Sequence, residues 1–557
     1  MVDQAPPVSS PDLADAPQRA STATSRRDFL KRSAAVAGAT AAGAALVGVT
    51  PRPAEAQAIL NGASRSALAH YKRIQAANQA RLRDPLHVDN GDEARYHAKF
   101  GSYSKGLPHN GLGEVDLAAW GLFAHAAKIQ SWDAFEAIPM GGPLLLKNPL
   151  GGVAYLLEGA DPGCMLMPAA PAFASAELAG EIVENYWQAL LRDVPFADYA
   201  THPLAAEAVA DLNAMTVFRG PKVGGQVTPG TLFRGLTPGD LVGPYLSQFM
   251  WLDTPFGAER VDRQMRTVQA GVEYMTDYAE WLNIQRGGAP SFPTQYDPTP
   301  RYPRNGRDLG EWVHIDVLVQ AYFNAMLTLY ALGAPTDSGD PYRASQTSCG
   351  FGTLGTPYTA SILAAVAKPA LCTVWHQKWF VHRRLRPEAY AGRVHNHLTG
   401  AAAYPIHADV LNSDGVQEIF SRFDTYLLPM AFPEGSPAHP AYGAGHATVA
   451  GACVTVLKAF FDESWVIPNP VEAATDGLSL VPWTGASLTV GGELNKLASN
   501  VAIGRNLAGV HWRSDATESL KLGEDIAIRF LREEKLLLRE RFSGWSLTKF
   551  DGTVITV

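Results

Sequence analysis

Basic residues and histidines recur in three segments of the C-terminal half, at spacings that could build an anion site. The first segment, KWFVHRRLRPEAY, holds Lys378 and Arg386, eight residues apart, with Arg383 and Arg384 adding charge between them. Pro387 disfavours helix at the residue before it, so Arg386 should lie where a helix ends and could point into a cleft. Taken alone, the segment is equally compatible with a solvated basic helix face.

The second segment, EGSPAHPAYGAGHATVAGACVTVL, holds His439 and His446, seven residues apart. Gly443, Ala444 and Gly445 form a small, turn-permissive lead to apolar helical sequence. The start of a helix presents free backbone N–H groups and the positive end of the helix dipole, which together bind anions. The competing interpretation is a loop with two incidental histidines.

The third segment, IGRNLAGVHWRSDATES, holds Arg505, His511 and Asp515. If the segment is helical, Asp515 shares a face with His511 and could bond one ring nitrogen. The other ring nitrogen would then be free to act as a ligand or a nucleophile. Alternatively, Asp515 is the N-cap of the following helix, and it could fill both roles.

Together the three segments supply what a tetrahedral oxyanion needs. Lys378, Arg386 and Arg505 would offset two or three negative charges, and arginine donors match oxygens in pairs. A helix start and two or three histidines would complete the pocket. The sequence therefore predicts a cluster of fixed cations around one small anion.

The elements that must position these residues are predicted to be mainly helices. Apolar stretches predict helices over 176–191, over 312–332 with an end at Gly333, over 370–385 after Pro369, and over about 516–539. Spacings of three and four predict one more helix face, made by Val261, Met265, Val268, Val272 and Met275.

Two other stretches are not expected to be helical. Five prolines between Gly287 and Asn305 exclude regular helix there and predict a long ordered connection. At the C-terminus, KFDGTVITV places Asp551 and Gly552 between two short arms, which predicts a hairpin.

Composition and the N-terminus limit the class of protein. The chain has 557 residues and a net charge of −8, which excludes a disordered chain and argues against a nucleic-acid binder. Apart from the N-terminus, no apolar run approaches the roughly 18–20 residues of a membrane span. Arg26 and Arg27, an apolar stretch over 34–49 and a small-residue site at 54–56 resemble a twin-arginine export signal. Residues 1–56 are thus expected to direct export to the periplasm or beyond, the alternative being a basic disordered tail.

The order of the three segments resembles the signature of the vanadium-dependent haloperoxidases and the related acid phosphatase superfamily. WHQKWFVHRRLRPEA, EGSPAHPAYGAGHA and GRNLAGVH are most similar to algal and bacterial bromoperoxidases. The resemblance implies an all-α fold of helical bundles with a few short β-hairpins. It also implies an N-terminal helical half (57–335), a catalytic half (336–557) and a homo-oligomer.

By the same resemblance the cofactor is vanadate, with His511 as its protein ligand. Its oxygens would be held by Lys378, Arg386, Arg505, His446 and the amide of Gly445. Lys378 would also activate hydrogen peroxide, His446 would act as acid and base, and His439 would be the extra histidine of bromoperoxidases. Asp515 as the partner of His511 is inferred from spacing alone.

One position departs from the family pattern, since Ala444 stands where the family has serine. Losing one hydrogen bond to a charged group costs about 1.5–3 kcal/mol, although a water could replace it. The departure bears on cofactor affinity and halide preference more than on the type of reaction.

The implied reaction is the oxidation of halide, with bromide or iodide favoured, by hydrogen peroxide to hypohalous acid, which halogenates a small organic nucleophile. One alternative is an acid phosphatase with His511 as nucleophile and His446 as leaving-group acid. A second alternative, motivated by Ala444, is an oxyanion-binding protein that has lost catalysis.

Overall fold

The computed structural model of the chain describes residues 62–557. Residues 72–557 form one compact unit, and residues 1–71 belong to another. The predicted export signal lies outside the described residues. The predicted division of the mature chain at residue 335 stays a prediction.

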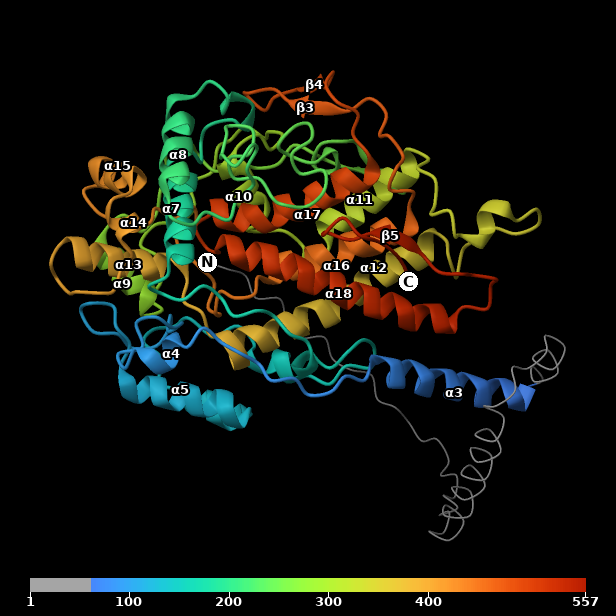
Figure 1. Cartoon of the computed structure of the whole chain (residues 1–557), viewed down its shortest axis with the longest axis horizontal. Helices are drawn as coiled ribbons and strands as arrows, with labels where there is room; N and C mark the ends of the chain where they lie inside the picture. The colour runs from blue at the N-terminus through green and yellow to red at the C-terminus, as the bar shows by residue number, and fades with distance from the viewer. Residues whose placement is uncertain (1–61) are drawn as a thin grey trace, which may run out of the picture. The chain divides into compact units, whose positions relative to one another are not determined.

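The described part of the chain is built from helices joined by long connections (Figure 1). The first set comprises α3 (Gly62–Ala80), α4 (Asp92–Arg95), α5 (Leu117–Ile129), α6 (Trp132–Glu136), α7 (Ala176–Leu190), α8 (Pro203–Ala214), α9 (Tyr278–Gln285), α10 (Gly306–Trp312) and α11 (Gln320–Ala331). The second set comprises α12 (Thr356–His376), the π-helical segment η6 (Gln377–His382), α13 (Pro387–Leu398), α14 (Ala408–Leu411), α15 (Asp414–Phe423), α16 (Gly445–Phe460), α17 (Val490–Leu507) and α18 (Arg513–Leu537).

The strands within residues 62–557 form three two-stranded antiparallel hairpins. They are β1 (Thr254–Phe256) with β2 (Glu259–Val261), β3 (Val471–Ala473) with β4 (Leu480–Pro482), and β5 (Ser546–Thr548) with β6 (Val554–Thr556). Helices with a few short hairpins confirm the predicted all-α class. The last hairpin also confirms the predicted turn at Asp551 and Gly552.

Helix α16 is the central helix of the C-terminal bundle. It packs against α12, α17 and α18, and every residue in it except His446 is buried (Figure 1). Two glycines let α16 and α18 approach closely, because a Cβ on Gly451 would lie 2.2 Å from the Leu520 carbonyl oxygen and one on Gly523 would lie 2.0 Å from that of Thr448. The start of α16 is therefore fixed deep in the bundle.

The prediction of a helix over residues 261–275 is wrong. Val261 ends β2, and the chain then runs beside the proline-rich connection, bridging Met265 to Arg301 and Val268 to Tyr296. Backbone groups of this segment find partners in that extended neighbour rather than in a helix. The proline-rich stretch itself is non-helical, as predicted, up to the start of α10 at Gly306.

Other helix boundaries also differ from the predictions. The helix predicted after Pro369 begins at Thr356 instead, and Pro369 lies inside it. The helix predicted over 312–332 is formed only from Gln320, so residues 313–319 are a loop. The helix over 176–191 is confirmed as α7, and the predicted last helix is α18, which starts three residues early.

Among the described helices, Thr356–His382 is long and apolar enough to cross a membrane by length and composition. Half of its most apolar stretch is buried inside the protein, and a core helix meets the same criteria. We infer no membrane span from it.

Candidate active site

The three predicted cations come from three different elements and are all buried. Lys378 lies in the π-helical segment η6, Arg386 is the residue before α13, and Arg505 lies in the last turn of α17. Their exposed fractions are 0%, 1% and 6%. Arg386 was predicted to follow the end of a helix, and it lies in the break between η6 and α13, where Pro387 starts the new helix.

The guanidinium of Arg386 joins two of the predicted histidines. Its Nη1 donates to His511 Nε2 at 3.0 Å, and its Nη2 donates to His439 Nδ1 at 2.8 Å. Lys378 Nζ donates to the carbonyl oxygens of Pro440 and Ala441 at 2.8 and 3.0 Å. The first and third segments and the loop between them therefore meet at one point.

None of the three cations forms an ion pair within residues 62–557. Arg505 Nη1 donates to the Val313 carbonyl at 2.6 Å, while its Nε is buried without a partner among the described residues. Burial lowers the pKa of Arg386 and of Arg505 to about 10, and it lowers the pKa of Lys378 well below its ordinary value. Buried charges are normally paired, so this cluster calls for an anion.

His511 is held as a neutral imidazole with one lone pair facing the cations. Burial, followed by the charges of Arg386 and Lys378, holds the pKa of His511 well below its ordinary value. Arginine can only donate, so His511 Nε2 must accept from Arg386, and Nδ1 carries the proton. That Nδ1 lies 2.8 Å from Asp515 Oδ2.

A chain of buried charges holds Asp515 in turn. The other oxygen of Asp515 accepts from Arg384 Nη1 at 2.7 Å, and Arg384 Nη2 donates to Glu181 Oε2 at 2.8 Å. Asp515 also accepts from the Trp512 amide at 3.1 Å, which caps the start of α18. His511 precedes that helix, so the predicted pairing with Asp515 is confirmed but does not arise from a shared helix face. The predicted N-cap role is wrong, because Trp512 is the N-cap and Asp515 is the third residue of α18, whose side chain accepts from the N-cap amide.

His446 lies in the first turn of α16 and has a partner that the sequence did not reveal. Its Nε2 is 2.9 Å from Asp316 Oδ1, across 130 residues of chain. Burial and the charge of Arg505 lower the pKa of His446, whereas Asp316 raises it. Asp316 sits in the loop 313–319 that had been predicted as helix. No spacing signal marks it.

The start of α16 lies within the same group of residues. Gly445 is its first residue, and Ala444 is the N-cap, which gives no side-chain hydrogen bond to the helix. Ala444 is 1% exposed, and its own amide donates to Ser519 Oγ at 2.7 Å. A methyl group thus stands where a serine hydroxyl could have donated into the site.

His439 contacts the cluster from the other side. Beyond its bond to Arg386, its ring lies 4.9 Å from the ring of Trp375, centroid to centroid. Burial, then the charges of Lys378 and Arg386, hold the pKa of His439 well below its ordinary value. It is therefore a neutral neighbour at physiological pH.

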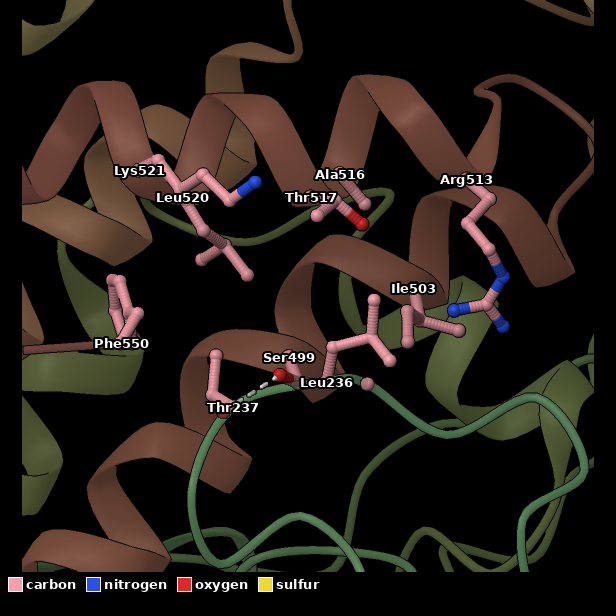
Figure 2. A pocket seen from close by; sticks show the side chains of 11 residues that line it. Leu236, Thr237, Ser499, Ile503, Arg513, Ala516, Thr517, Leu520, Lys521 and Phe550 are labelled. Carbon is pink, nitrogen blue, oxygen red and sulfur yellow. Dashed lines mark hydrogen bonds between the residues drawn. The ribbon is translucent and has the colours of Figure 1, made fainter. Parts of the chain in front are cut away.

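The structure also holds cavities away from this cluster. One of about 180 Å³ lies between α17, α18 and the loop around Leu236 and Thr237, and it contains none of the predicted site residues (Figure 2). A second, of about 170 Å³, is lined in part by Asp316. The second cavity therefore reaches the partner of His446, although none of the predicted site residues lines it.

The chain is similar to proteins of a known family. Residues 359–539 match the family described as the VCPO second helical-bundle domain. The chain is 35% identical to a vanadium-dependent bromoperoxidase of Corallina pilulifera, over 89% of this chain and 98% of that protein. It is 35% identical to one of Ascophyllum nodosum, over 84% and 87%.

A solved structure shows the same fold. The homohexameric second vanadate-dependent bromoperoxidase of Ascophyllum nodosum superposes with a TM-score of 0.85 at 33% identity. The match covers 88% of this chain and 90% of that one. The similarity therefore extends over both halves of the molecule.

Proposed function

The chain belongs to the vanadium-dependent bromoperoxidases, and from that premise we propose that its buried cation cluster holds vanadate on His511 for the oxidation of bromide by hydrogen peroxide. Membership makes it a vanadate-dependent haloperoxidase. The residue roles and the choice of halide are our proposal. The observation that carries the proposal is a group of three buried cations that form no ion pair within residues 62–557. One of them, Arg386, donates to the lone pair of His511, and burial together with the charges of all three lowers the pKa of that histidine.

The residues present fit vanadate well. His511 Nε2 would be the ligand, and Lys378, Arg386 and Arg505 would hold the oxygens with their donors. The buried Nε of Arg505, which has no partner among the described residues, would gain an acceptor. Arg386 Nη1, which donates to His511 Nε2 in the structure, would donate to an oxygen instead. The chemistry that vanadate supplies when bound is Lewis-acid activation of peroxide toward halide, at constant oxidation state.

Two side chains next to the vanadate ligand have proposed roles in the reaction, one in proton transfer and one in hydrogen bonding to the oxidant. Oxidation of bromide by hydrogen peroxide to hypobromous acid consumes one proton and releases water. His446, oriented by Asp316, is the group that holds and delivers that proton. Lys378, whose ammonium is buried among carbonyls, is placed to polarise the oxidant by hydrogen bonding.

The test is turnover of the vanadate-reconstituted protein with each halide in turn. We expect bromide and iodide to be oxidised and chloride to be oxidised far more slowly. Hydrolysis of a phosphate ester without peroxide is measured on the same preparation, and nothing in the comparisons favours that activity. Equal rates with chloride and bromide would contradict the halide preference.

We also propose that the protein forms a homo-oligomer. Large apolar side chains stand out from the surface of the segment 145–166, where Tyr155 is 95% exposed and Leu157 is 102% exposed. Leu145 and Leu166 are exposed on the same stretch. Apolar patches of this kind mark interaction surfaces. Light scattering on the purified protein tests the proposal, and a monomer at micromolar concentration would contradict it.

Export by the twin-arginine route remains a proposal that rests on the sequence of residues 1–56. Replacing Arg26 and Arg27 by lysine should retain the protein in the cytoplasm of the producing cell. Fractionation followed by immunodetection checks this, and unchanged export would refute it.

A further inference from the structure

The cavity next to Asp316 has a shape and lining that the halide reaction does not use. It encloses about 170 Å³ between the segment that follows β2 and the α10–α11 loop. A cavity of about 150 Å³ is enough for benzene, whereas one water needs only about 10–15 Å³. The space therefore suits a single-ring organic molecule and is far larger than a halide requires.

One wall of the cavity is apolar. Trp312, Met265 and Ile315 contribute to it, and Ile315 is 55% exposed at the surface. A tryptophan and a methionine are common contacts for an aromatic ring, since both offer polarisable surface. The wall therefore favours a ligand with a flat apolar body.

The cavity also contains a charged anchor, Arg263. Its Nη2 donates to the Phe249 carbonyl, while its Nε is buried and without a hydrogen-bond partner among the described residues. No ion pair to Arg263 occurs within residues 62–557, and Asp253, the carboxylate whose charge acts on it, pairs with Arg260 at 3.0 Å. An arginine with a buried, unused donor and no paired carboxylate suits an anionic group.

Three other charged side chains line the cavity. The guanidinium of Arg266 stacks over the ring of Tyr296 at 3.6 Å, and Asp262 Oδ1 accepts from the Gln264 amide at 3.0 Å. Asp316 is bonded to His446. Among the described residues, Arg263 is thus the lining cation that no aromatic ring and no carboxylate engages, and it shares the cavity with the partner of His446.

We propose that this cavity binds the organic nucleophile of the reaction as an aromatic monoanion, with its charged group on Arg263 and its ring against Trp312 and Met265. The proposal rests on the proposed function, which supplies hypobromous acid. In the bromination step the ring carbon forms a bond to bromine as the Br–O bond breaks, and the ring proton leaves with the hydroxide as water. Arg263 is a binding residue and takes no part in oxidising bromide.

The test uses two probes of one skeleton, 4-hydroxybenzoate and the neutral 4-hydroxybenzyl alcohol. Calorimetric titration of the vanadate-loaded enzyme, without peroxide or bromide, should give at least tenfold tighter binding for the carboxylate. Arg263→Gln should remove that difference. The control Arg422→Gln, which removes a surface pair with Glu418 on α15, should leave it unchanged.

Bromination of an equimolar mixture gives an independent readout. The wild-type enzyme should brominate the carboxylate in larger proportion than free hypobromous acid does, and Arg263→Gln should return the product ratio to that of the free reagent. Equal binding of both probes by the wild-type enzyme, no binding of either, or a product ratio equal to that of the free reagent would overturn the proposal. Binding is measured without turnover, so failure of the haloperoxidase reaction would be seen separately.

Discussion

Asp515→Asn tests whether the carboxylate behind His511 sets the affinity for vanadate. In the structure Asp515 is fully buried, accepts from His511 Nδ1 at 2.8 Å and from Arg384 Nη1 at 2.7 Å. The amide can accept on one side only, so the variant either turns its NH₂ toward Arg384 or loses the bond to His511. In both cases His511 becomes a poorer ligand, because its Nδ1–H no longer donates to a charged acceptor.

The expected loss follows from two effects of known size. Removing a carboxylate that orients a metal-bound histidine typically costs 10–100-fold in affinity, which is about 1.4–2.7 kcal/mol. Breaking a buried ion pair also destabilises the fold by about 3–5 kcal/mol. Glu181 retains its bond to Arg384 and limits that second cost.

The assay is a titration of the apoprotein with orthovanadate, followed by bromination of a dye, together with a thermal melt. We expect the vanadate Kd to rise 10–100-fold and the melting temperature to fall. The control is Glu518→Gln, on the same helix, where an exposed pair with Lys521 is lost and neither quantity should change. A folded Asp515→Asn protein with unchanged vanadate Kd would refute the role we assign to this carboxylate.

Two further predictions concern the site, and a third concerns His314, which lies in the loop 313–319 with Asp316. Ala444→Ser should add a hydrogen bond to the anion and lower the vanadate Kd at least several-fold, since such bonds are worth about 1.5–3 kcal/mol. An unchanged Kd in the same titration would contradict this and would show that a water already fills the role. Asp316→Asn removes the group that raises the pKa of His446, so that pKa falls further and the alkaline limb of the kcat profile should move to lower pH. A pH–rate profile with an unmoved alkaline limb would exclude His446 as the acid. Burial of His314 opposes its protonation, but hydrogen bonds to the carboxylates of Glu311 and Glu434 raise its pKa to about 9, above the unfolded value of 6.5. The contribution of His314 to stability is therefore complete below about pH 6.5 and is lost as the pH rises through about 9. His314→Gln should accordingly lower the melting temperature more at pH 6 than at pH 10. An equal drop at both pH values would contradict this.

The local features of the site could be predicted from sequence because they depend on neighbours in the chain. The glycine-containing turn before His446 begins α16, and Pro387 keeps Arg386 out of a helix and begins α13 directly after it. The pairing of His511 with Asp515 was also predicted, although through a helix face rather than through a cap. In each case the spacing along the chain fixes the geometry within a turn or two.

The supporting residues could not be predicted because they come from distant parts of the chain. Asp316 meets His446 across 130 residues, and Glu181 meets Arg384 across 203. In the sequence Arg384 was only additional charge, whereas in the structure it holds Asp515. The false helix over 261–275 has the same origin, since its backbone bonds to a distant connection rather than to itself.

The central claim is that His511, within three buried cations, binds the vanadate on which bromide oxidation depends. The most direct measurement titrates orthovanadate into apo wild-type and His511→Ala protein and records both bound vanadate and bromination. We expect one vanadate bound per wild-type chain, activity proportional to that occupancy, and neither in the variant. Bromination that does not require vanadate, or a folded His511→Ala protein that binds vanadate and brominates like the wild type, would contradict the claim.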